Sequence, residues 1–566
     1  CTNIKGLPKM TTYSNFLTIS LLFLLALTSS AQTNSENRSV RGYATVDKVA
    51  TSISLHWDAS ATNVTAYNIY RRTLGATSWD AVLVNLGPAD STYTDADVTT
   101  TGVYEYSIEK VTDITDPFRS GGAKVRGYSY IAASIEKPAI HNRGVFLVLI
   151  AKNIKDSLAT SIDILKQDLI ADGWEVYSEV VGPIAEVQDV KALIDAKKNN
   201  MGCDAVFLLG HIPVPYSGLY CEDSNYPYPP DGHDSADALS HCGAWPADVY
   251  YGVIDGAWTD TDSTTLAFRS ENNNLIGDGK FDNVRIPGTV DIRVGRADFS
   301  RMPLFDGSEI ELTKQYLDKV HTYKTGSTPT VKKGVIENNF AAFDEGFSSA
   351  ALRDFTAICG KDAIVEDDVL EASETTDYLL SYSCGEGSFT NCNGFGTSAD
   401  FKTKNAGAFL HVFGSYFGDW DIENNLMRAS LCSKKMGLAA LWSGRPKWVT
   451  HTLALGETYG DIALRTQNNW QDYDANFYQN GTHSTLLGDP SLRHDMMLPA
   501  ENISLVANFD RSITNIEWNA SSETDIDGYY IYRSHKGHGG FIPLNAIPIT
   551  ALTYIDSMPF DGTNFY

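Results

Sequence analysis

The run Gly144-Val145-Phe146-Leu147-Val148-Leu149-Ile150 is a continuous apolar stretch about a quarter of the way along the chain. A strand that is covered on both faces has this pattern, whereas a strand with one face in water alternates. An amphipathic stretch at 157–171 follows, and then a second short strand at 174–177. A helical stretch at 187–198 and a strand at 205–210 repeat the order. This alternation predicts a parallel sheet that lies between helices.

A similar order restarts further along the chain. The apolar patterns predict one strand, one helix and three more strands, at 334–337, 347–358, 378–382, 407–413 and 438–442. A helix predicted at 309–323 links the two regions. We therefore expect a two-lobe α/β core, with a first lobe at 138–325 and a second lobe at 326–498, in which mostly parallel sheets are covered by helices.

Both ends of this core are flanked by segments with a period of two. Residues 40–135 contain Ile53-Ser54-Leu55-His56-Trp57, then Ala66–Arg72 and Tyr104–Ile108. Short alternating runs with turn residues between them predict an antiparallel, all-β immunoglobulin-like sandwich.

The same pattern recurs at 499–566, where a tryptophan strand at 513–518 precedes a Tyr-x-Ile-Tyr-Arg-like strand at 528–533. This is an internal repeat, and both copies resemble the fibronectin type III domain. In the second copy, the strand that corresponds to Tyr104–Ile108 is expected to begin at Asn564-Phe565-Tyr566. The second sandwich is therefore expected to be truncated.

The apolar run Phe16–Leu27 is followed by small residues that include Ser29 and Ala31. Twelve residues are too few to span a bilayer, which needs about 20, and the small residues fit a secretory cleavage site. We interpret residues 10–31 as a signal peptide of bacterial type. No later run reaches spanning length, so the mature protein is expected to be secreted or attached to the cell surface, without an integral membrane span.

The charge balance narrows the possible partners. The 566 residues carry 44 Lys and Arg against 70 Asp and Glu, which gives a net charge of −26. Phosphate recognition needs clustered cations, so nucleic acid and anionic membrane surfaces are disfavoured. At 566 residues the chain is too long for a single hydrophobic core, and this length predicts three or four domains.

Seven cysteines remain when Cys1 is set aside. An odd number means that at least one cysteine keeps a free thiol or forms an intermolecular disulfide. Export permits disulfides, and both Cys221 with Cys242 and Cys384 with Cys392 are close enough in sequence to close a loop. The spacing does not decide the pairing.

Several stretches in the core resemble the gingipain-type cysteine peptidases, which have a caspase-like fold. They occur in a matching order over about 138–498 and comprise Phe207–His211 with Pro213 and Pro215, Ala247–Gly252 with Asp255 and Gly256, Val294–Arg296, and Leu486–Leu492. The third stretch is expected to follow a strand. The resemblance implies a peptidase scaffold.

In that family, a histidine in a Gly-His-Gly turn and a cysteine in a small-Cys-x-x-Gly turn form the catalytic dyad. Here the turn after 378–382 has Glu386 at the histidine position, and the turn after 409–413 has Ser415 at the cysteine position, aligned by Gly418. A serine needs a strong neighbouring base, and an ordinary glutamate carboxylate, with a pKa near 4.3, is a poor one at neutral pH. The dyad is therefore expected to be lost.

Three other residues could restore a catalytic role. Cys384 lies two residues before Glu386, in the same turn, and could act as a displaced nucleophile. Its partner would be His451, which follows the strand at 438–442. His411 is on a strand, where packing is the favoured interpretation. The sequence Gly537-His538-Gly539 has the Gly-His-Gly pattern of the family's catalytic turn. It lies inside the second sandwich and is interpreted as a chance match.

Two loop regions suggest binding. Asp260, Asp262, Asp278 and Asp282 lie in a stretch rich in Asp and Asn, and oxygen-rich loops of this kind suit Ca²⁺; a solvated acidic loop fits equally well. Aromatic residues also gather at the strand ends of the first lobe, where ligands of α/β sheets bind, although loop packing is favoured for most of them: Tyr216, Tyr220, Tyr226, Tyr228, Trp245, Tyr250, Tyr251 and Trp258.

These patterns leave two functions open. The first is a non-catalytic peptidase homologue that binds an extracellular protein or glycan ligand. The second is an active secreted cysteine endopeptidase that uses Cys384 with His451.

Overall fold

The computed structural model describes residues 34–59, 63–219, 241–328, 330–445, 447–474, 480–524 and 526–566. The predicted signal peptide at 10–31 lies outside these ranges. Every helix within them is too short or too polar to cross a bilayer.

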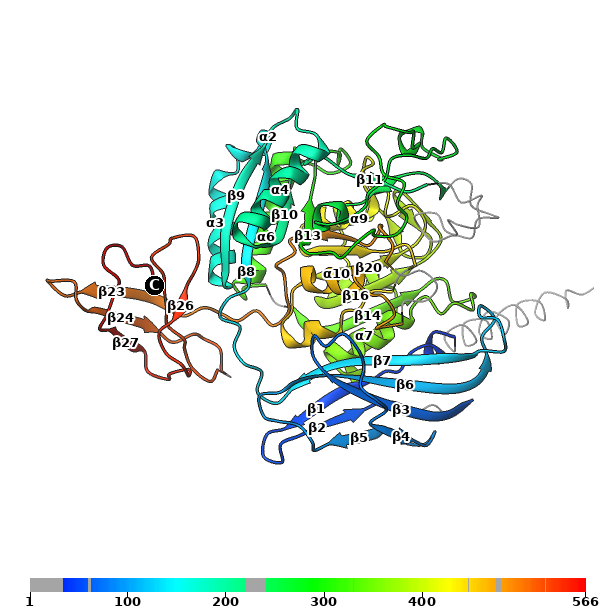
Figure 1. The fold of residues 1–566 in the computed structure, drawn as a ribbon, viewed down its shortest axis with the longest axis horizontal. Coiled ribbons are helices and arrows are strands. Elements are labelled where there is room, and N and C mark those ends of the chain that lie inside the picture. The colour runs from blue at the N-terminus through cyan, green and yellow to red at the C-terminus, as the bar shows by residue number, and fades with distance from the viewer. Residues whose placement is uncertain are drawn as a thin grey trace, which may run out of the picture.

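A ten-stranded sheet forms the centre of the molecule, in the order β15-β14-β16-β20-β21-β22-β13-β10-β8-β9 (Figure 1). Neighbouring strands are parallel except for the pair β21 and β22. In chain order the strands are β8 (Gly144–Ala151), β9 (Trp174–Val181), β10 (Cys203–Leu209), β13 (Arg293–Ala297), β14 (Val331–Asn338), β15 (Ile364–Glu366), β16 (Tyr378–Cys384), β20 (Phe409–Phe413), β21 (Ala439–Trp442) and β22 (Thr485–Gly488).

The two predicted lobes are the two halves of this single sheet. They join because β22, from the end of the second half, pairs in parallel with β13 of the first half. Since β21 and β22 run in opposite directions, β22 points with the strands of the first half, and the other strands of the second half point toward the opposite edge of the sheet. Val294–Arg296, expected to follow a strand, instead lies within β13.

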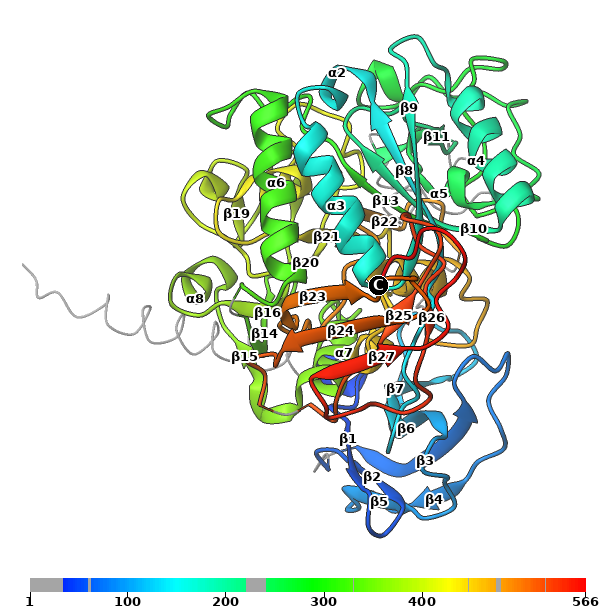
Figure 2. The ribbon, with the colours of Figure 1, turned by 90° about the vertical axis from the view of Figure 1, so that its left-hand side faces the viewer.

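Helices pack against both halves of the sheet. The chain moves from β8 to β9 in one direction and from β9 to β10 in the other, so right-handed crossovers place the intervening helices on opposite faces. Figure 2 shows α3 and the linking helix α6 side by side in front of the strands. The helices are α2 (Lys152–Lys155), α3 (Ala159–Ala171), α4 (Val187–Met201), α5 (Val249–Gly252), α6 (Glu309–Lys324), α7 (Ser349–Cys359), α8 (Val369–Thr375), α9 (Leu426–Cys432) and α10 (Tyr459–Gln467).

The N-terminal sandwich has two antiparallel sheets, β1-β2-β5 and β4-β3-β6-β7. Its core holds the alternating residues that predicted it, Ile53, Leu55 and Trp57, which are buried against Tyr67 and Ile69. The strands are β1 (Tyr43–Asp47), β2 (Ser52–His56), β3 (Val64–Thr73), β4 (Val84–Leu86), β5 (Thr92–Asp95), β6 (Val103–Thr115) and β7 (Lys124–Ser134). Strand β7 packs against α7 and against η5 (His451–Leu455), so this sandwich is joined to the α/β core.

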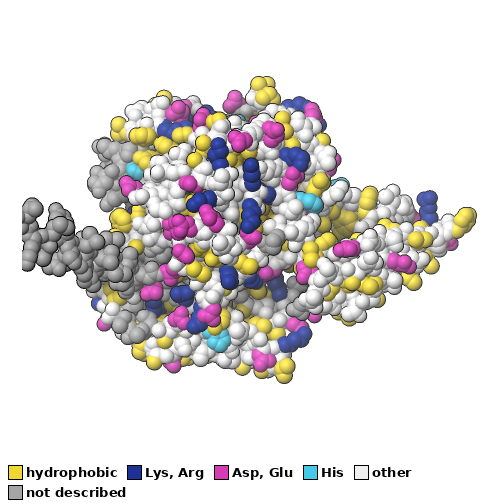
Figure 3. Space-filling model, turned by 180° about the vertical axis from the view of Figure 1, so that it is seen from behind, with side chains coloured by type: hydrophobic (Ala, Val, Ile, Leu, Met, Phe, Trp, Pro, Cys, Tyr) yellow, Lys and Arg dark blue, Asp and Glu magenta, His cyan; other side chains and the backbone are white. Residues whose placement is uncertain are grey.

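The C-terminal sandwich projects to one side of the molecule (Figures 1 and 3). Its strands are β23 (Glu501–Ala507), β24 (Thr514–Asn519), β25 (Tyr532–Arg533), β26 (Ile542–Pro543) and β27 (Thr553–Asp556). The predicted strand at 528–533 is reduced to its last two residues. Figure 3 shows apolar side chains along its surface, and those more than half exposed in this domain include Ile503, Val506, Ile547, Ile555 and Met558.

The two sandwiches, which form the internal repeat, also have a set of side-chain contacts in common. In the first copy, Asp95 accepts hydrogen bonds from Arg71 Nη1 at 2.7 Å and from the Tyr106 hydroxyl at 2.9 Å. In the second copy, Asp556 accepts from Arg533 Nη1 at 2.6 Å and from the hydroxyl of Tyr566 at 2.7 Å. The two sandwiches therefore share an arginine, an aspartate and a tyrosine in the same arrangement.

Candidate functional site

The turns that follow β16 and β20, at 385–388 and 414–421, touch each other and are called the crest below. The Gly385 amide donates to the Phe413 carbonyl at 3.1 Å. A Cβ at Gly387 would lie 2.5 Å from the Ser415 carbonyl oxygen, and one at Gly414 would lie 2.6 Å from that of Gly385. Only glycine permits this approach, so the glycines bring the two turns together.

The crest places the two substituted positions in adjoining turns. Glu386 is exposed, and its carbonyl oxygen accepts from the Asn393 amide at 2.8 Å. Ser415 is half-buried in the second turn. The positions that the resemblance assigns to an imidazole and a thiol thus present a carboxylate and a hydroxyl.

Gly418 supports the second turn of the crest from below. A Cβ at this position would lie 2.0 Å from Cζ3 of Trp442, a buried ring whose Nε1 donates to the Gly414 carbonyl at 2.9 Å. We expect Gly418→Ala to lower the free energy of unfolding by about 1–3 kcal/mol, the usual cost of overpacking. Gly182→Ala, at an exposed glycine with no atom within 4 Å of the added Cβ, is the matched control in chemical denaturation. Equal stability of the two variants would contradict this packing.

Several residues that the sequence interpretation missed surround the crest. Tyr416 has a left-handed backbone (φ 66°) and stacks on His241, with ring centroids 4.3 Å apart. Asp419 is fully buried and accepts from Arg269 Nη1 at 2.6 Å and from Asn272 Nδ2 at 2.8 Å. These contacts join the crest to the long connection after β10. Sequence spacing could not reveal them, because the partners lie about 150 residues away.

Cys384 is fully buried at the end of β16. Its thiol donates to the Asn338 side-chain oxygen at 3.2 Å, and burial raises the pKa of the thiol to about 12. Few thiolate anions form at neutral pH under these conditions, and the thiolate is the nucleophilic species.

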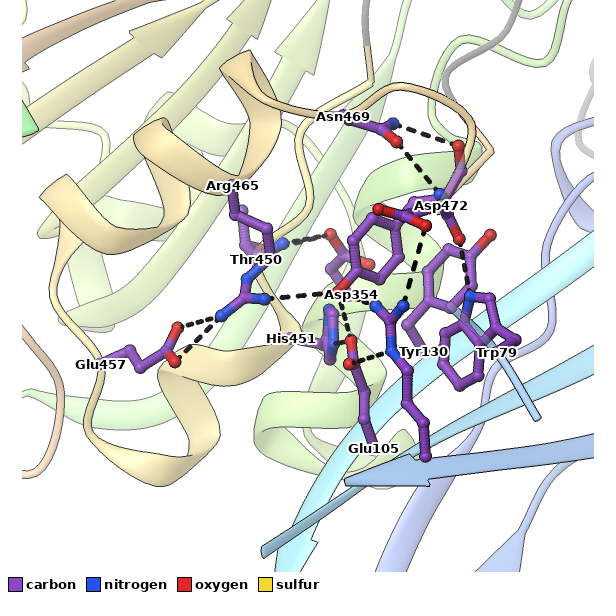
Figure 4. Close-up of polar contacts among 12 residues, drawn as sticks. Trp79, Glu105, Tyr130, Asp354, Thr450, His451, Glu457, Arg465, Asn469 and Asp472 are labelled. Atoms are coloured by element: carbon purple, nitrogen blue, oxygen red, sulfur yellow. Dashed lines mark hydrogen bonds and ion pairs between the residues drawn. The ribbon is translucent and has the colours of Figure 1, made fainter. Parts of the chain in front are cut away.

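His451 lies in a different environment. Its Nε2 is 2.7 Å from Glu105 of the N-terminal sandwich, and its ring packs near Tyr130 and Tyr473 (Figure 4). The structure therefore does not bring Cys384 and His451 together. The imidazole instead contacts the buried Glu105 carboxylate of the docked sandwich, and the thiol contacts Asn338.

His411 is buried on β20, as expected for a packing residue. Its ring meets Phe355 edge to face at 5.2 Å, and burial lowers the pKa of the imidazole to about 4. It lines a small cavity of about 60 Å³ between α7 and the sheet.

Three of the four aspartates of the calcium hypothesis accept hydrogen bonds from their own loop, and the fourth, Asp262, donates its backbone amide to one of them. Asp260 accepts from the amides of Gly277 and Gly279, at 2.6 and 2.9 Å. In the same way, Asp278 accepts from Leu275 and Lys280, and Asp282 accepts from Thr261 and Asp262. Within the described ranges no three acidic, histidine or cysteine side chains are grouped to hold a metal ion. These residues do not form a ready-made ligand set, and calcium binding stays a prediction.

Most of the described aromatic residues near the first half are packing residues, as favoured. Trp245, Tyr250 and Tyr251 are buried, and Trp245 stacks on Trp442 of the second half with centroids 6.1 Å apart. Three others, Tyr220, Tyr226 and Tyr228, lie outside the described residues.

A histidine–aspartate pair was also missed. His211 follows β10, and its Nδ1 lies 2.8 Å from the buried carboxylate of Asp298, which follows β13. The hydrogen bond to Asp298 raises the pKa of His211. The position of each residue directly after a buried strand was the available signal.

The sequence Gly537-His538-Gly539 has a structural role. The His538 carbonyl accepts from the Val176 amide at 2.7 Å, so the turn attaches the C-terminal sandwich to β9. It is remote in the fold from the crest turns.

No family model and no curated protein matches the chain. Among solved structures, the Arg-specific cysteine proteinase gingipain R is similar with a TM-score of 0.45 and 13% identity, over 74% of this chain and 92% of that chain. A fibronectin type III-like protein from Clostridium thermocellum and the fibronectin type III domain of human collagen alpha-1(XX) align to 18% and 19% of this chain, with identities of 19% and 15%. They are covered over 90% and 93% of their own lengths, and both TM-scores are 0.13.

The fold class is therefore a large, mostly parallel sheet with helices packed against it, flanked by small sandwiches of antiparallel sheets.

Proposed function

We propose that the chain is an exported, non-catalytic relative of the gingipain-type peptidases that binds an extracellular protein or glycan ligand. The observation that supports it is the crest, where the structure has Glu386 and Ser415, at the positions that the resemblance assigns to the dyad, in adjoining turns. The N-terminal apolar run supports export, and an N-terminus at Gln32 in protein recovered from the medium or cell surface would test it.

The contacts of the two remaining candidates favour the same conclusion. A cysteine peptidase needs a thiolate in contact with an imidazole that can later protonate the leaving amine. Cys384 is held by Asn338 with a raised pKa, whereas His451 is held by Glu105. Activity through this pair would require the N-terminal sandwich to release His451.

The state of Cys384 leads to a direct measurement. We expect iodoacetamide to modify Cys384 in the folded protein at least about a hundredfold more slowly than in the unfolded protein, because the thiol is buried and its pKa is about 12. Peptide mapping by mass spectrometry after timed alkylation measures both rates. Rapid and selective modification of Cys384 in the folded protein would contradict the assignment.

The function itself is tested by peptidase assays of the full chain on casein and on a broad peptide library, with and without Ca²⁺. We expect no cleavage above that of a Glu386→Ala, Ser415→Ala variant. Cleavage that disappears in Cys384→Ala or in His451→Ala would establish the alternative, an active endopeptidase that uses this pair.

A further inference from the structure

A polar groove of about 460 Å³ lies where the N-terminal sandwich meets the loop at 471–474. Strands β3, β6 and β7 form one wall and the loop forms the other. We call it the junction groove. Pockets that bind small ligands have volumes of about 300–1,000 Å³ and often lie between domains, so its size and place both suit a ligand. Its principal lining residues are Trp79, Glu109, Arg119, Tyr128, Tyr130 and Asp472.

Three aromatic rings lie along the groove. Tyr130 has Tyr128 on one side, with centroids 6.1 Å apart and planes 10° apart, and Trp79 at 6.0 Å and 24°. Tyr128 and Trp79 are half-buried, whereas Tyr130 is nearly covered. The groove therefore has nearly parallel rings at a regular spacing of about 6 Å, and the two outer rings are partly accessible.

The rings are fixed before any ligand arrives. Trp79 Nε1 donates to the Asp472 carbonyl at 2.7 Å, and the Arg72 guanidinium lies 4.2 Å from the Trp79 ring centroid (Figure 4). The Tyr130 hydroxyl accepts from the Asp474 amide at 2.8 Å. Rigid side chains lose little entropy on binding, which favours affinity.

The charged side chains that line the groove each lie near a side chain of opposite charge. Glu109 lies 3.7 Å from Arg126, Asp472 lies 3.9 Å from Arg72, and Asp474 lies 2.7 Å from Lys447. Arg119, the cation of the lining, lies 3.9 Å from Asp116. Each charged side chain of the lining thus lies within 4 Å of an opposite charge, so the groove offers neither a cluster of isolated carboxylates to a cationic ligand nor a cluster of isolated cations to an anionic one. The groove suits a neutral molecule that has hydroxyl groups.

We propose that the junction groove binds a neutral saccharide, whose C–H faces pack on Trp79 and Tyr128 and whose hydroxyl groups bond to Glu109, Asp472 and Arg119. Aromatic rings supply broad apolar area with little entropy to lose. Carboxylates and guanidinium groups accept from and donate to hydroxyls respectively. This site is separate from the crest and does not depend on whether the crest is catalytic.

The experiment titrates the full chain with cellobiose, maltose, lactose and N,N′-diacetylchitobiose, by calorimetry and tryptophan fluorescence. Concentrations reach about 10 mM, which detects even a millimolar Kd. We expect at least one disaccharide to bind, and Trp79→Ala to weaken it at least about tenfold, as expected for the loss of a stacking ring. Trp470→Ala is the matched control, because Trp470 directly precedes the same loop and is 57% exposed but does not line the groove.

Tyr128→Ala is a second groove variant, in case Trp79→Ala disturbs the junction, and circular dichroism with thermal unfolding checks that both fold. Loss of binding in either folded variant, with the Trp470→Ala affinity unchanged, supports the proposal. The proposal is overturned if no disaccharide binds, if binding is the same in both groove variants, or if a trimethyllysine peptide or inorganic phosphate binds there instead. This inference deepens the glycan-binding part of the proposed function. Peptidase activity is a separate readout, so failure here removes a glycan site at this groove and leaves the non-catalytic assignment untouched.

Discussion

Replacing Glu105 with alanine is expected to lower the free energy of unfolding by about 3–5 kcal/mol, the range found when one partner of a buried ion pair is removed. Glu105 is fully buried between the N-terminal sandwich and the α/β core. It accepts from Arg72 Nε at 2.7 Å, from the Tyr473 hydroxyl at 2.5 Å and from His451 at 2.7 Å (Figure 4). Its removal leaves a buried guanidinium without its carboxylate.

The control for this variant is Glu136→Ala, in the same domain. Glu136 forms an exposed ion pair with Lys48, and exposed pairs contribute about 0–1 kcal/mol. Chemical denaturation of both variants and of the unchanged protein measures the difference. Equal loss of stability in the two variants would contradict a sandwich that is locked to the core by Glu105.

Because of the Glu105 carboxylate, we expect the free energy of unfolding to decrease as the pH falls. Burial raises the pKa of Glu105, but the hydrogen bonds and charges of His451 and Arg72 outweigh this and hold it well below its ordinary value. A depressed folded pKa stabilises the protein above the unfolded pKa, near 4.3, and this contribution is lost as the pH falls below it. The stability difference between the unchanged protein and Glu105→Gln should therefore shrink below about pH 4.

Rebuilding the dyad is the second large effect that we expect. The double variant Glu386→His, Ser415→Cys places an imidazole and a thiol in the adjoining turns of the crest. An imidazolium next to a thiol lowers the thiol pKa far below its ordinary value near 8.5. At about pH 6, we expect alkylation at position 415 to be about ten- to a hundredfold faster than in Ser415→Cys alone, because low-pKa thiolates are more abundant but less nucleophilic.

Mass spectrometry of the alkylated peptides assigns the modified position, and the same protein is then assayed on peptides. The single variants are the controls, since each has only half of the pair. Equal alkylation rates for the single Ser415→Cys and the double variant would mean that the two turns do not carry the dyad positions, and the functional proposal would lose its main support.

The sequence predicted much of the fold because the deciding signals are local. The apolar run 144–150 became β8, and the helical patterns at 157–171, 187–198 and 309–323 became α3, α4 and α6 within a few residues. The repeated Trp and Tyr-Arg strands located both sandwiches. The sequence could not show that the two lobes share one sheet, because the pairing of β13 with β22 joins segments almost 200 residues apart.

The candidate site was predicted in part. Turn glycines located Glu386 and Ser415, which the fold places in adjoining turns. Pairing Cys384 with His451 could be suggested from the sequence only because neither residue's surroundings were visible there. The contact of His451 with Glu105 links residues 346 positions apart and depends on how the sandwich docks.

What the sequence determined by itself was many of the central strands and helices, the repeat, and the chemical identity of the two crest side chains, since these depend on residue type and short-range periodicity. The tertiary structure decided which of these groups meet. Packing of the N-terminal sandwich on the core occupied His451 and shaped the junction groove, and packing within the core enclosed Cys384. Contacts between segments distant in sequence leave no periodic signal in either segment.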